Sequence, residues 1–203
     1  MTQGFVYSLS SANAGGSDTE IQYNNSGVID GDSGFTTDGA GNVTGVSVAF
    51  SDNTKGIVGT TTNDDAGAGY VGEYISSIVL SGSPVSLTTT VSANVTSISL
   101  TAGDWDVYGQ IYFSGTATDT SGFSAGITAT SATMPSAASL TDAQSLSIIQ
   151  NGTGFPTAGQ MIVPTIPARV SLSGTTTYYL VAACAFLGGT AGAAGTIRAR
   201  RVR

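Results

Sequence analysis

Histidine is absent from this chain of 203 residues, and cysteine occurs once, as Cys184. Without histidine the chain cannot build a Ser-His-Asp or Cys-His catalytic site, nor a histidine-based metal site or proton relay. Cys184 cannot form a disulfide within the chain, and it lies in an apolar stretch with no base to activate its thiol. We therefore expect a protein that is not an enzyme and that holds no cofactor and no metal.

Charged residues and long apolar runs are also scarce. Only 9% of the residues are charged, and the longest mostly apolar stretch, residues 178–187, is far shorter than the roughly 20 residues of a membrane-spanning helix. The opening residues Met1–Gly4 lack the cationic start of a secretory signal. We therefore expect a soluble protein that is made in the cytoplasm of a cell and does not insert into a membrane.

Small residues and an uneven charge distribution divide the chain into two parts. Glycine numbers 28, and glycine, serine, threonine and alanine together indicate a β-protein with small side chains on its packed surfaces. Residues 1–65 carry eight acidic side chains against Lys55 alone, whereas residues 66–203 carry five of each sign. A polar, small-residue stretch at 63–69 separates them. We predict an extended arm of short β-hairpins over 1–65 and a compact β domain over 66–203.

Alternating apolar residues predict two long strands in the second part. Residues 104–113 place Trp105, Val107, Ile111 and Phe113 on one face and polar side chains on the other, which indicates a half-buried strand. Residues 178–187 are apolar on both faces, so this strand is expected to be central in its sheet or to lie against another subunit.

Shorter strands are expected between the glycine, proline and asparagine signals of the second part. The candidates are 73–80, 85–89, 94–100, 124–129, 160–164, 168–172 and 196–202. Only residues 139–150 have a pattern that fits a short helix. About nine short strands in this length favour an all-β fold, an antiparallel sandwich of the jelly-roll kind following the extended β arm.

The arm carries a recognisable motif. The features are the sequence IQYNNSG at 21–27, the block 31–35, which ends at Phe35, and turn dipeptides at 24–25, 26–27, 30–31 and 38–39. With these features, residues 16–44 resemble a module that recurs in bacteriophage tail-fibre and other virion surface proteins. The resemblance implies a place on the virion surface after synthesis in the host bacterium, with Ile21, Gln22, Tyr23 and Phe35 as candidates for docking onto the particle.

The second part resembles another viral element. Its segments 99–107, 125–127, 130–135, 175–180 and 196–201 look like the small jelly-roll heads, similar to the tumour-necrosis-factor-like class, that finish many phage fibres and decorations. Such heads assemble as homotrimers, and the resemblance therefore implies a homotrimer here. The candidate trimer contacts are Tyr178, Leu180, Arg198 and Arg200.

The last six residues hold four of the six cations of the chain. On a strand, Arg198 and Arg200 would point one way and Arg201 and Arg203 the other, and no aromatic residues interleave with them. We therefore expect no nucleic-acid partner, and we expect these arginines to pair with acidic groups of a neighbouring subunit or of the arm. The candidates for recognition of a host-surface polysaccharide or protein are Tyr108, Tyr112, Phe123 and Phe155.

These observations favour a structural protein of a phage virion. The main hypothesis is a short homotrimeric fibre, anchored by its arm to other virion proteins, that contributes to attachment to the host surface. The alternative is a capsid decoration or head-fibre protein that ornaments and stabilises the shell. A third, less favoured hypothesis is a polysaccharide-cleaving spike that uses the carboxylate pair Asp104 and Asp106, two residues that more commonly solvate a strand.

Overall fold

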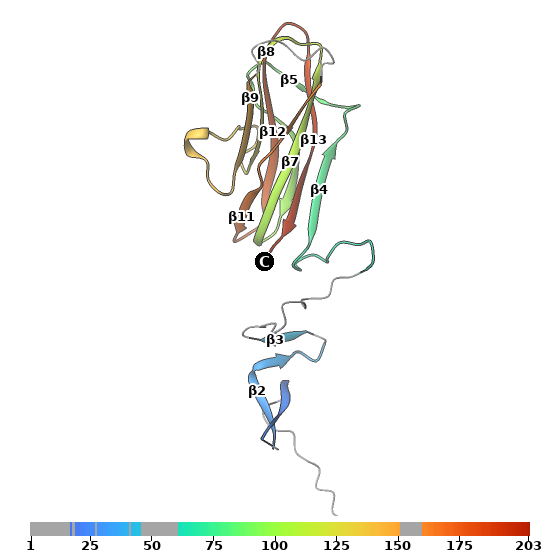
Figure 1. The fold of residues 1–203 in the computed structure, drawn as a ribbon, viewed down its shortest axis with the longest axis vertical. Coiled ribbons are helices and arrows are strands. Elements are labelled where there is room, and N and C mark those ends of the chain that lie inside the picture. The colour runs from blue at the N-terminus through green and yellow to red at the C-terminus, as the bar shows by residue number, and fades with distance from the viewer. Residues whose placement is uncertain (1–16, 18, 27, 41, 46–60, 151–159) are drawn as a thin grey trace, which may run out of the picture. The chain divides into compact units, whose positions relative to one another are not determined.

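The computed structural model describes residues 17, 19–26, 28–40, 42–45, 61–150 and 160–203. The chain divides into two compact units, Met1–Thr61 and Thr62–Arg203. Each unit contains its own β structure (Figure 1), and we refer to them as the arm and the head. The two units meet between residues 61 and 62, and the expected division at residue 65 into a docking arm and a projecting domain stays a prediction.

The arm holds one small antiparallel sheet in the order β1-β2-β3. Its strands are β1 (Glu20–Asn25), β2 (Val28–Thr37) and β3 (Val43–Gly45). The turn expected at Asp38 is present, because the Asp38 carboxylate accepts bonds from the Ala40 N–H at 2.8 Å and the Asn42 side-chain N–H at 2.6 Å, while Gly39 takes a φ of +72°. The turn expected at residues 30–31 is wrong: pairing with β1 keeps Asp30 and Gly31 extended inside β2.

The head is a sandwich of two antiparallel sheets (Figure 1). The first sheet has the order β10-β7-β13-β4, with β11 also pairing with β7 and β5 with β13, and the second has the order β6-β12-β8-β9. The bounds are β4 (Tyr74–Val79), β5 (Val85–Leu87), β6 (Ala93–Leu100), β7 (Gly103–Gly115), β8 (Thr118–Thr128), β9 (Ser145–Gln150), β10 (Gln160–Pro164), β11 (Ala168–Leu172), β12 (Thr176–Leu187) and β13 (Ala191–Arg201). The predicted all-β antiparallel sandwich is confirmed, and the homotrimer stays a prediction.

The short helix expected over residues 139–150 is wrong. The second half of this segment forms strand β9, in which Ile149 pairs with Phe123 of β8, and its helical structure is limited to Ser139, the last residue of the 3-10 turn η1 (Ala137–Ser139). Serine and β-branched isoleucine are weak helix formers, and pairing with an existing sheet edge outweighs the weak helical pattern. Ser136 begins η1 by accepting a hydrogen bond from the Ala138 N–H.

The core of the head lies between the two sheets and follows the predicted alternation of the long strands. Trp105, Val107, Ile111 and Phe113 of β7 are all fully buried, and the Phe113 ring meets the Phe123 ring of β8 with 5.1 Å between centroids. Strand β12 lies between β6 and β8, so the prediction of a central strand is confirmed. Side chains from both sheets therefore interdigitate in one hydrophobic cluster.

Leu180 shows how closely the two sheets approach. It is fully buried on β12, and a Cβ atom placed on Gly109 or Gly195 of the opposite sheet would lie 3.3 Å or 3.2 Å from a Leu180 methyl group. The same Cβ atoms would meet backbone oxygens of the adjoining strands at 2.5 Å and 2.3 Å. Two glycines facing the core thus provide the space that the Leu180 side chain fills.

Candidate functional site

The outer face of the first sheet brings together four of the predicted site residues, Tyr108 and Tyr112 on β7 and Arg198 and Arg200 on β13. We call these four residues the Arg–Tyr face. Both arginines are exposed and both tyrosines are half-buried. Tyrosine and arginine are the residues most enriched in the energetically important parts of binding surfaces.

Strand alternation explains why these side chains share a face. On β13, Ile197 and Ala199 are fully buried in the core, which turns Arg198 and Arg200 outward. The register places Tyr108 directly opposite Arg198 and Tyr112 opposite Ala194. Side chains directly opposite in an antiparallel pair lie about 4.5–5.5 Å apart at Cβ, so Tyr108 and Arg198 are neighbours on the surface.

A small cleft of about 50 Å³ opens on this face between β7 and β13. Its lining consists of Tyr108, Gly109, Gln110, Thr196 and Arg198. Thr165 occupies both backbone groups of Gly109, because its hydroxyl accepts from the Gly109 N–H at 2.8 Å while its N–H donates to the Gly109 carbonyl at 2.9 Å. The polar atoms offered to a ligand are therefore those of side chains.

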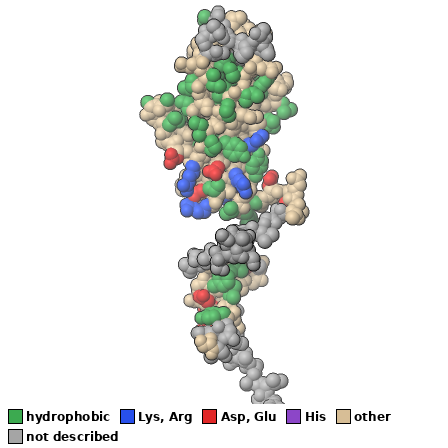
Figure 2. Space-filling model, viewed as in Figure 1, with side chains coloured by type: hydrophobic (Ala, Val, Ile, Leu, Met, Phe, Trp, Pro, Cys, Tyr) green, Lys and Arg blue, Asp and Glu red, His purple; other side chains and the backbone are tan. Residues whose placement is uncertain are grey.

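The two arginines of the face differ from the other head arginines in their partners. Among the described residues, Arg198 and Arg200 make no ion pair within 4.0 Å, whereas Arg169, Arg201 and Arg203 each pair with a carboxylate. Toward one end of the head, the basic side chains gather with acidic ones on the surface drawn in Figure 2. Arg198 and Arg200 thus present guanidinium groups whose hydrogen-bonding capacity is directed outward.

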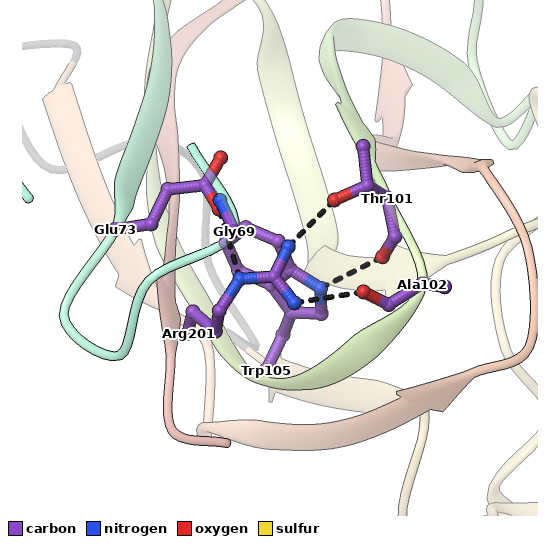
Figure 3. Close-up of polar contacts among 6 residues, drawn as sticks. All are labelled: Gly69, Glu73, Thr101, Ala102, Trp105 and Arg201. Carbon is purple, nitrogen blue, oxygen red and sulfur yellow. Dashed lines mark hydrogen bonds and ion pairs between the residues drawn. The ribbon is translucent and has the colours of Figure 1, made fainter. Parts of the chain in front are cut away.

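At the end of β13, the Arg201 side chain is held by contacts with other residues of the head (Figure 3). Its Nε donates to Glu73 at 2.8 Å, one terminal nitrogen donates to the Ala102 carbonyl at 2.7 Å, and the other donates to the Thr101 hydroxyl at 2.6 Å. The guanidinium lies 4.2 Å from the centre of the Trp105 ring, which adds a cation–π contact. These contacts fasten the start of β4, the β6–β7 turn and the end of β13 to one another.

Glu73, the ion-pair partner of Arg201, is held in its ionised form. It also accepts a hydrogen bond from the Gly69 N–H at 2.8 Å. Burial alone would raise the pKa of Glu73, but the Gly69 N–H and the Arg201 guanidinium together outweigh burial and hold the pKa below its ordinary value. We call Glu73, Arg201, Trp105 and Thr101 the clamp.

A second ion-pair group surrounds Asp104, the residue before Trp105. Its carboxylate lies 2.7 Å from a nitrogen of Arg203 and 4.0 Å from a nitrogen of Arg169. A hydrogen bond from the Ser171 side chain is the strongest influence on Asp104 and, acting with both guanidiniums against burial, lowers its pKa. A general acid in glycoside cleavage needs a raised pKa. The environment of Asp104 therefore gives no support to the polysaccharide-cleaving hypothesis.

These ion pairs correct one expectation about the C-terminal arginines. Arg201 and Arg203 were expected to pair with acidic groups of a neighbouring subunit or of the arm, but their partners, Glu73 and Asp104, belong to the same head. No aromatic residue interleaves with these arginines along β13, but Tyr108 of the adjacent strand lies opposite Arg198. A single strand's sequence cannot show side chains that its neighbours contribute.

The other candidate contacts of the head have different positions. Tyr178 is 4% exposed and Leu180 is fully buried, so both side chains pack in the core of their own subunit, and a trimer contact would fall instead to exposed residues. Phe123 was expected on the surface but is fully buried against Phe113. Phe155 lies outside the described residues.

The candidate docking residues lie on the sheet of the arm. Ile21 is half-buried and Gln22 exposed on β1, where Tyr23 keeps 49% of its surface, and Phe35 on β2 keeps 38%. The Phe35 ring covers Gly45 of β3, since a Cβ atom there would lie 2.9 Å from it. Tyr23 and Phe35 thus leave aromatic surface available, and their role in docking stays a prediction.

Sequence reasoning missed the clamp. Arg201 follows the buried Ile197 and Ala199 at two-residue intervals along β13, so it occupies a core-facing position. This spacing was the only feature of the sequence that indicated a buried arginine. Its partner Glu73 is 128 positions away along the chain, and nothing in the sequence connects them. Gly103 leaves the space that the buried arginine needs. Its φ is +133°, and a Cβ atom at this position would collide with the Arg201 guanidinium.

Other chemistry is limited in the part of the chain that the structure describes. No three cysteine, aspartate or glutamate side chains there gather closely enough to hold a metal ion. Burial raises the pKa of the Cys184 thiol to about 11, which keeps it protonated and unreactive at neutral pH. Within the same residues, no helix has the length and apolar character to span a membrane.

Comparison with known proteins gives little further information. No protein-family model matches the sequence, and a search of curated proteins finds no relative. Two solved structures with partial likeness are the infectious bursal disease virus VP2 subviral particle, at 15% identity and a TM-score of 0.37, and the Gx strain of the same virus, at 11% and 0.41. The alignments cover 64% and 73% of this chain but only 30% and 37% of those chains. Likeness at this level carries no functional argument.

Proposed function

We propose that this protein is a structural component of a bacteriophage virion. It forms a short homotrimeric fibre in which residues 1–65 anchor the chain to the particle and residues 66–203, which hold all the strands of the head, contribute to host attachment. The observation that carries the proposal is the Arg–Tyr face, where two guanidinium groups without an ion-pair partner among the described residues stand beside two half-buried tyrosines. The resemblance of residues 16–44 to phage surface modules supports the assignment to a phage virion.

The Arg–Tyr face has the chemistry of a recognition surface. Neither arginine forms an ion pair within 4.0 Å among the described residues, so both guanidinium groups are available to bind something outside the head. Tyrosine offers an apolar ring and a polar hydroxyl together, and its few rotatable bonds keep the entropic cost of binding low. Three such faces in a trimer would add weak contacts into firm attachment through effective concentration.

The second sheet supports the proposed trimer. Strands β6, β9 and β12 contain no charged residue, and β8 contains only Asp119. We call the outward-facing residues Ala183 and Ala185 of β12, Gly122 and Ser124 of β8, and Ile148 of β9 the uncharged face. These residues line a shallow groove of about 360 Å³ in which Ile148 is 53% exposed. Interfaces between identical subunits are depleted of charge in the same way.

The arm suits a docking role. Tyr23 and Phe35 expose aromatic surface on a sheet that is too small to bury them. The eight acidic residues of segment 1–65 would complement a basic patch on another virion protein. We propose that these two features attach the protein to the particle.

The experiment compares two binding partners for the fluorescently labelled full-length chain. We expect it to adsorb to susceptible bacteria, and we expect the double variant Arg198→Ala/Arg200→Ala to lose most of this adsorption. The matched control is Arg169→Ala, which removes an exposed cation from β11 of the same sheet. Thermal unfolding of each variant checks that the head is intact.

Two results would overturn the attachment role. One is adsorption of the labelled chain to capsids stripped of their surface proteins but not to bacteria, which would favour the decoration role instead. The other is equal adsorption by the double variant and the unaltered chain, which would remove the Arg–Tyr face from recognition.

A further inference from the structure

We propose that the cleft between Tyr108, Gln110, Thr196 and Arg198 binds the carboxylate group of an acidic surface polysaccharide. This inference rests on the proposed attachment function and specifies its ligand. The cleft lies at the centre of the Arg–Tyr face, with Tyr112 and Arg200 beyond it along the two strands.

The size of the cleft limits what can enter it. With a volume of about 50 Å³, the cleft has room for a small polar group of a ligand. A carboxylate is a group of this size. The remainder of the ligand would lie outside the cleft, along the surface of the sheet.

The lining selects for an acceptor of hydrogen bonds. Arg198 brings N–H donors only, and the Tyr108 hydroxyl, the Gln110 amide and the Thr196 hydroxyl can each donate one more bond. None of the described residues that line the cleft is acidic. A carboxylate accepts several hydrogen bonds, and a planar guanidinium matches its two oxygens, so donors of this kind favour a carboxylate over a neutral hydroxyl group.

The cleft is built on rigid elements. β13 is hydrogen-bonded to β7 on one side and to β4 on the other, and Thr196 is only 7% exposed. The backbone of Gly109 is fixed by Thr165 from the segment after β10. Donors held by central strands need little reorganisation, which lowers the entropic cost of binding a ligand.

The surroundings favour a polymer with widely spaced charges. Arg200 is two residues from Arg198 on the same strand face, about 7 Å along the strand, and could meet a second anionic group. Asp106 lies directly opposite Arg200, and the acidic residues of the chain outnumber its basic residues by seven. A dense polyanion such as a nucleic acid would therefore be repelled, whereas a polysaccharide with one carboxylate per repeat would not.

The half-buried tyrosines explain why a sugar is the preferred carrier of the carboxylate. Tyr108 lines the cleft, and Tyr112 lies four residues further along β7 on the same face. Each presents an amphipathic ring that can contact the apolar side of a sugar while its hydroxyl bonds a sugar hydroxyl. The ligand would thus lie along β7, with one carboxylate in the cleft.

The test is calorimetric titration of the full-length chain with three polymers. They are a hyaluronate oligosaccharide, in which every second sugar carries a carboxylate, the same oligosaccharide with its carboxylates reduced to alcohols, and poly(glycerol phosphate). We expect the uronate to bind, the reduced oligomer to bind at least about tenfold more weakly, and Arg198→Gln to lose about tenfold in affinity for the uronate. Arg169→Gln, which alters an exposed arginine outside the cleft, should leave the affinity unchanged.

Several results would overturn the inference. These are equal binding of the reduced oligomer, binding of the phosphate polymer alone, equal losses for Arg198→Gln and Arg169→Gln, and no uronate binding at all. Adsorption to bacteria separates the two proposals. A chain that adsorbs through the Arg–Tyr face yet ignores uronate contradicts only the ligand assigned here, whereas a chain that binds uronate but does not adsorb contradicts only the attachment function.

Discussion

The two sheets of the head enclose the same core but present different surfaces. Strands β7, β11 and β13 of the first sheet carry six charged residues, and three of them, Arg169, Arg198 and Arg200, are exposed arginines. The second sheet has Asp119 as the one charged residue of its four strands, and the groove on its outer face is lined by uncharged residues. Hydration of the head does not require this asymmetry, because mixed charges would suit both faces equally well.

The difference separates two tasks. Ion pairs and aromatic contacts on the first sheet close the head at the clamp and leave Arg198 and Arg200 available for an outside ligand. On the second sheet, by contrast, the residues of the uncharged face carry no charge to desolvate, which suits contact with another copy of the chain. We therefore propose that the charged first sheet serves recognition and that the largely uncharged second sheet serves assembly.

The largest expected effect comes from removing a core side chain that packs between the two sheets. Leu180→Ala should lower the free energy of unfolding by about 2–5 kcal/mol, because it removes a fully buried side chain and leaves a cavity between the sheets. Chemical denaturation of the head measures this loss. Leu187→Ala, at an exposed position of the same strand, is the control and should cost less than about 0.5 kcal/mol. Similar losses for both variants would contradict the arrangement of the core.

Breaking the clamp should have the next largest effect. Glu73→Gln leaves the buried Arg201 guanidinium without its counter-charge, and we expect a loss of about 3 kcal/mol in stability. The double variant Glu73→Gln/Arg201→Met should recover part of this loss, because it removes the uncompensated charge. If the double variant is less stable than Glu73→Gln, the buried charge is not the cause of the loss.

Acid should weaken the ion pairs of Glu73 and Asp104. The pKa values of Glu73 and Asp104 are both lowered in the folded head, so each carboxylate contributes stability that is fully present above its unfolded pKa and is lost as the pH falls through its folded pKa. We expect stability to be nearly constant from pH 7 to about 5 and to fall below about pH 4, near and under the ordinary values of these groups. Melting temperatures across this range test the expectation, and Glu73→Gln should show a shallower fall.

The sequence predicted what depends on alternation within a strand. Trp105, Val107, Ile111 and Phe113 were assigned to the core, and Arg198 and Arg201 to opposite faces of β13, because the two-residue period fixes the face of each side chain. The helix expected over 139–150 was wrong because the structure of this segment depends on contacts with another strand. Its residues 145–150 become a strand only by pairing with β8.

The candidate site depended on contacts between strands, which the sequence does not encode locally. Tyr108 and Arg198 are 90 positions apart and become neighbours through the register of β7 and β13. Phe123 and Tyr178 were expected at the surface or at a subunit contact as large aromatic residues, yet both are buried, because an aromatic side chain fits a core and an interface equally well. Only the fold separates these alternatives.

The smallest expected effect on folding, and the most informative one on assembly, comes from placing a charge on the uncharged face. Ala183→Glu puts a carboxylate beside Ser124 and Ile148 in the shallow groove of the second sheet. In an isolated head this substitution on the outer surface should change stability by less than about 0.5 kcal/mol, but in an assembly it would bury an unpaired charge. We therefore expect light scattering to show a shift from a trimer toward the 20.2 kDa monomer. Ser86→Glu, on the outer face of the first sheet opposite Gly192, should leave the trimer intact. A trimer that survives Ala183→Glu but not Ser86→Glu would reverse the assignment of the two sheets.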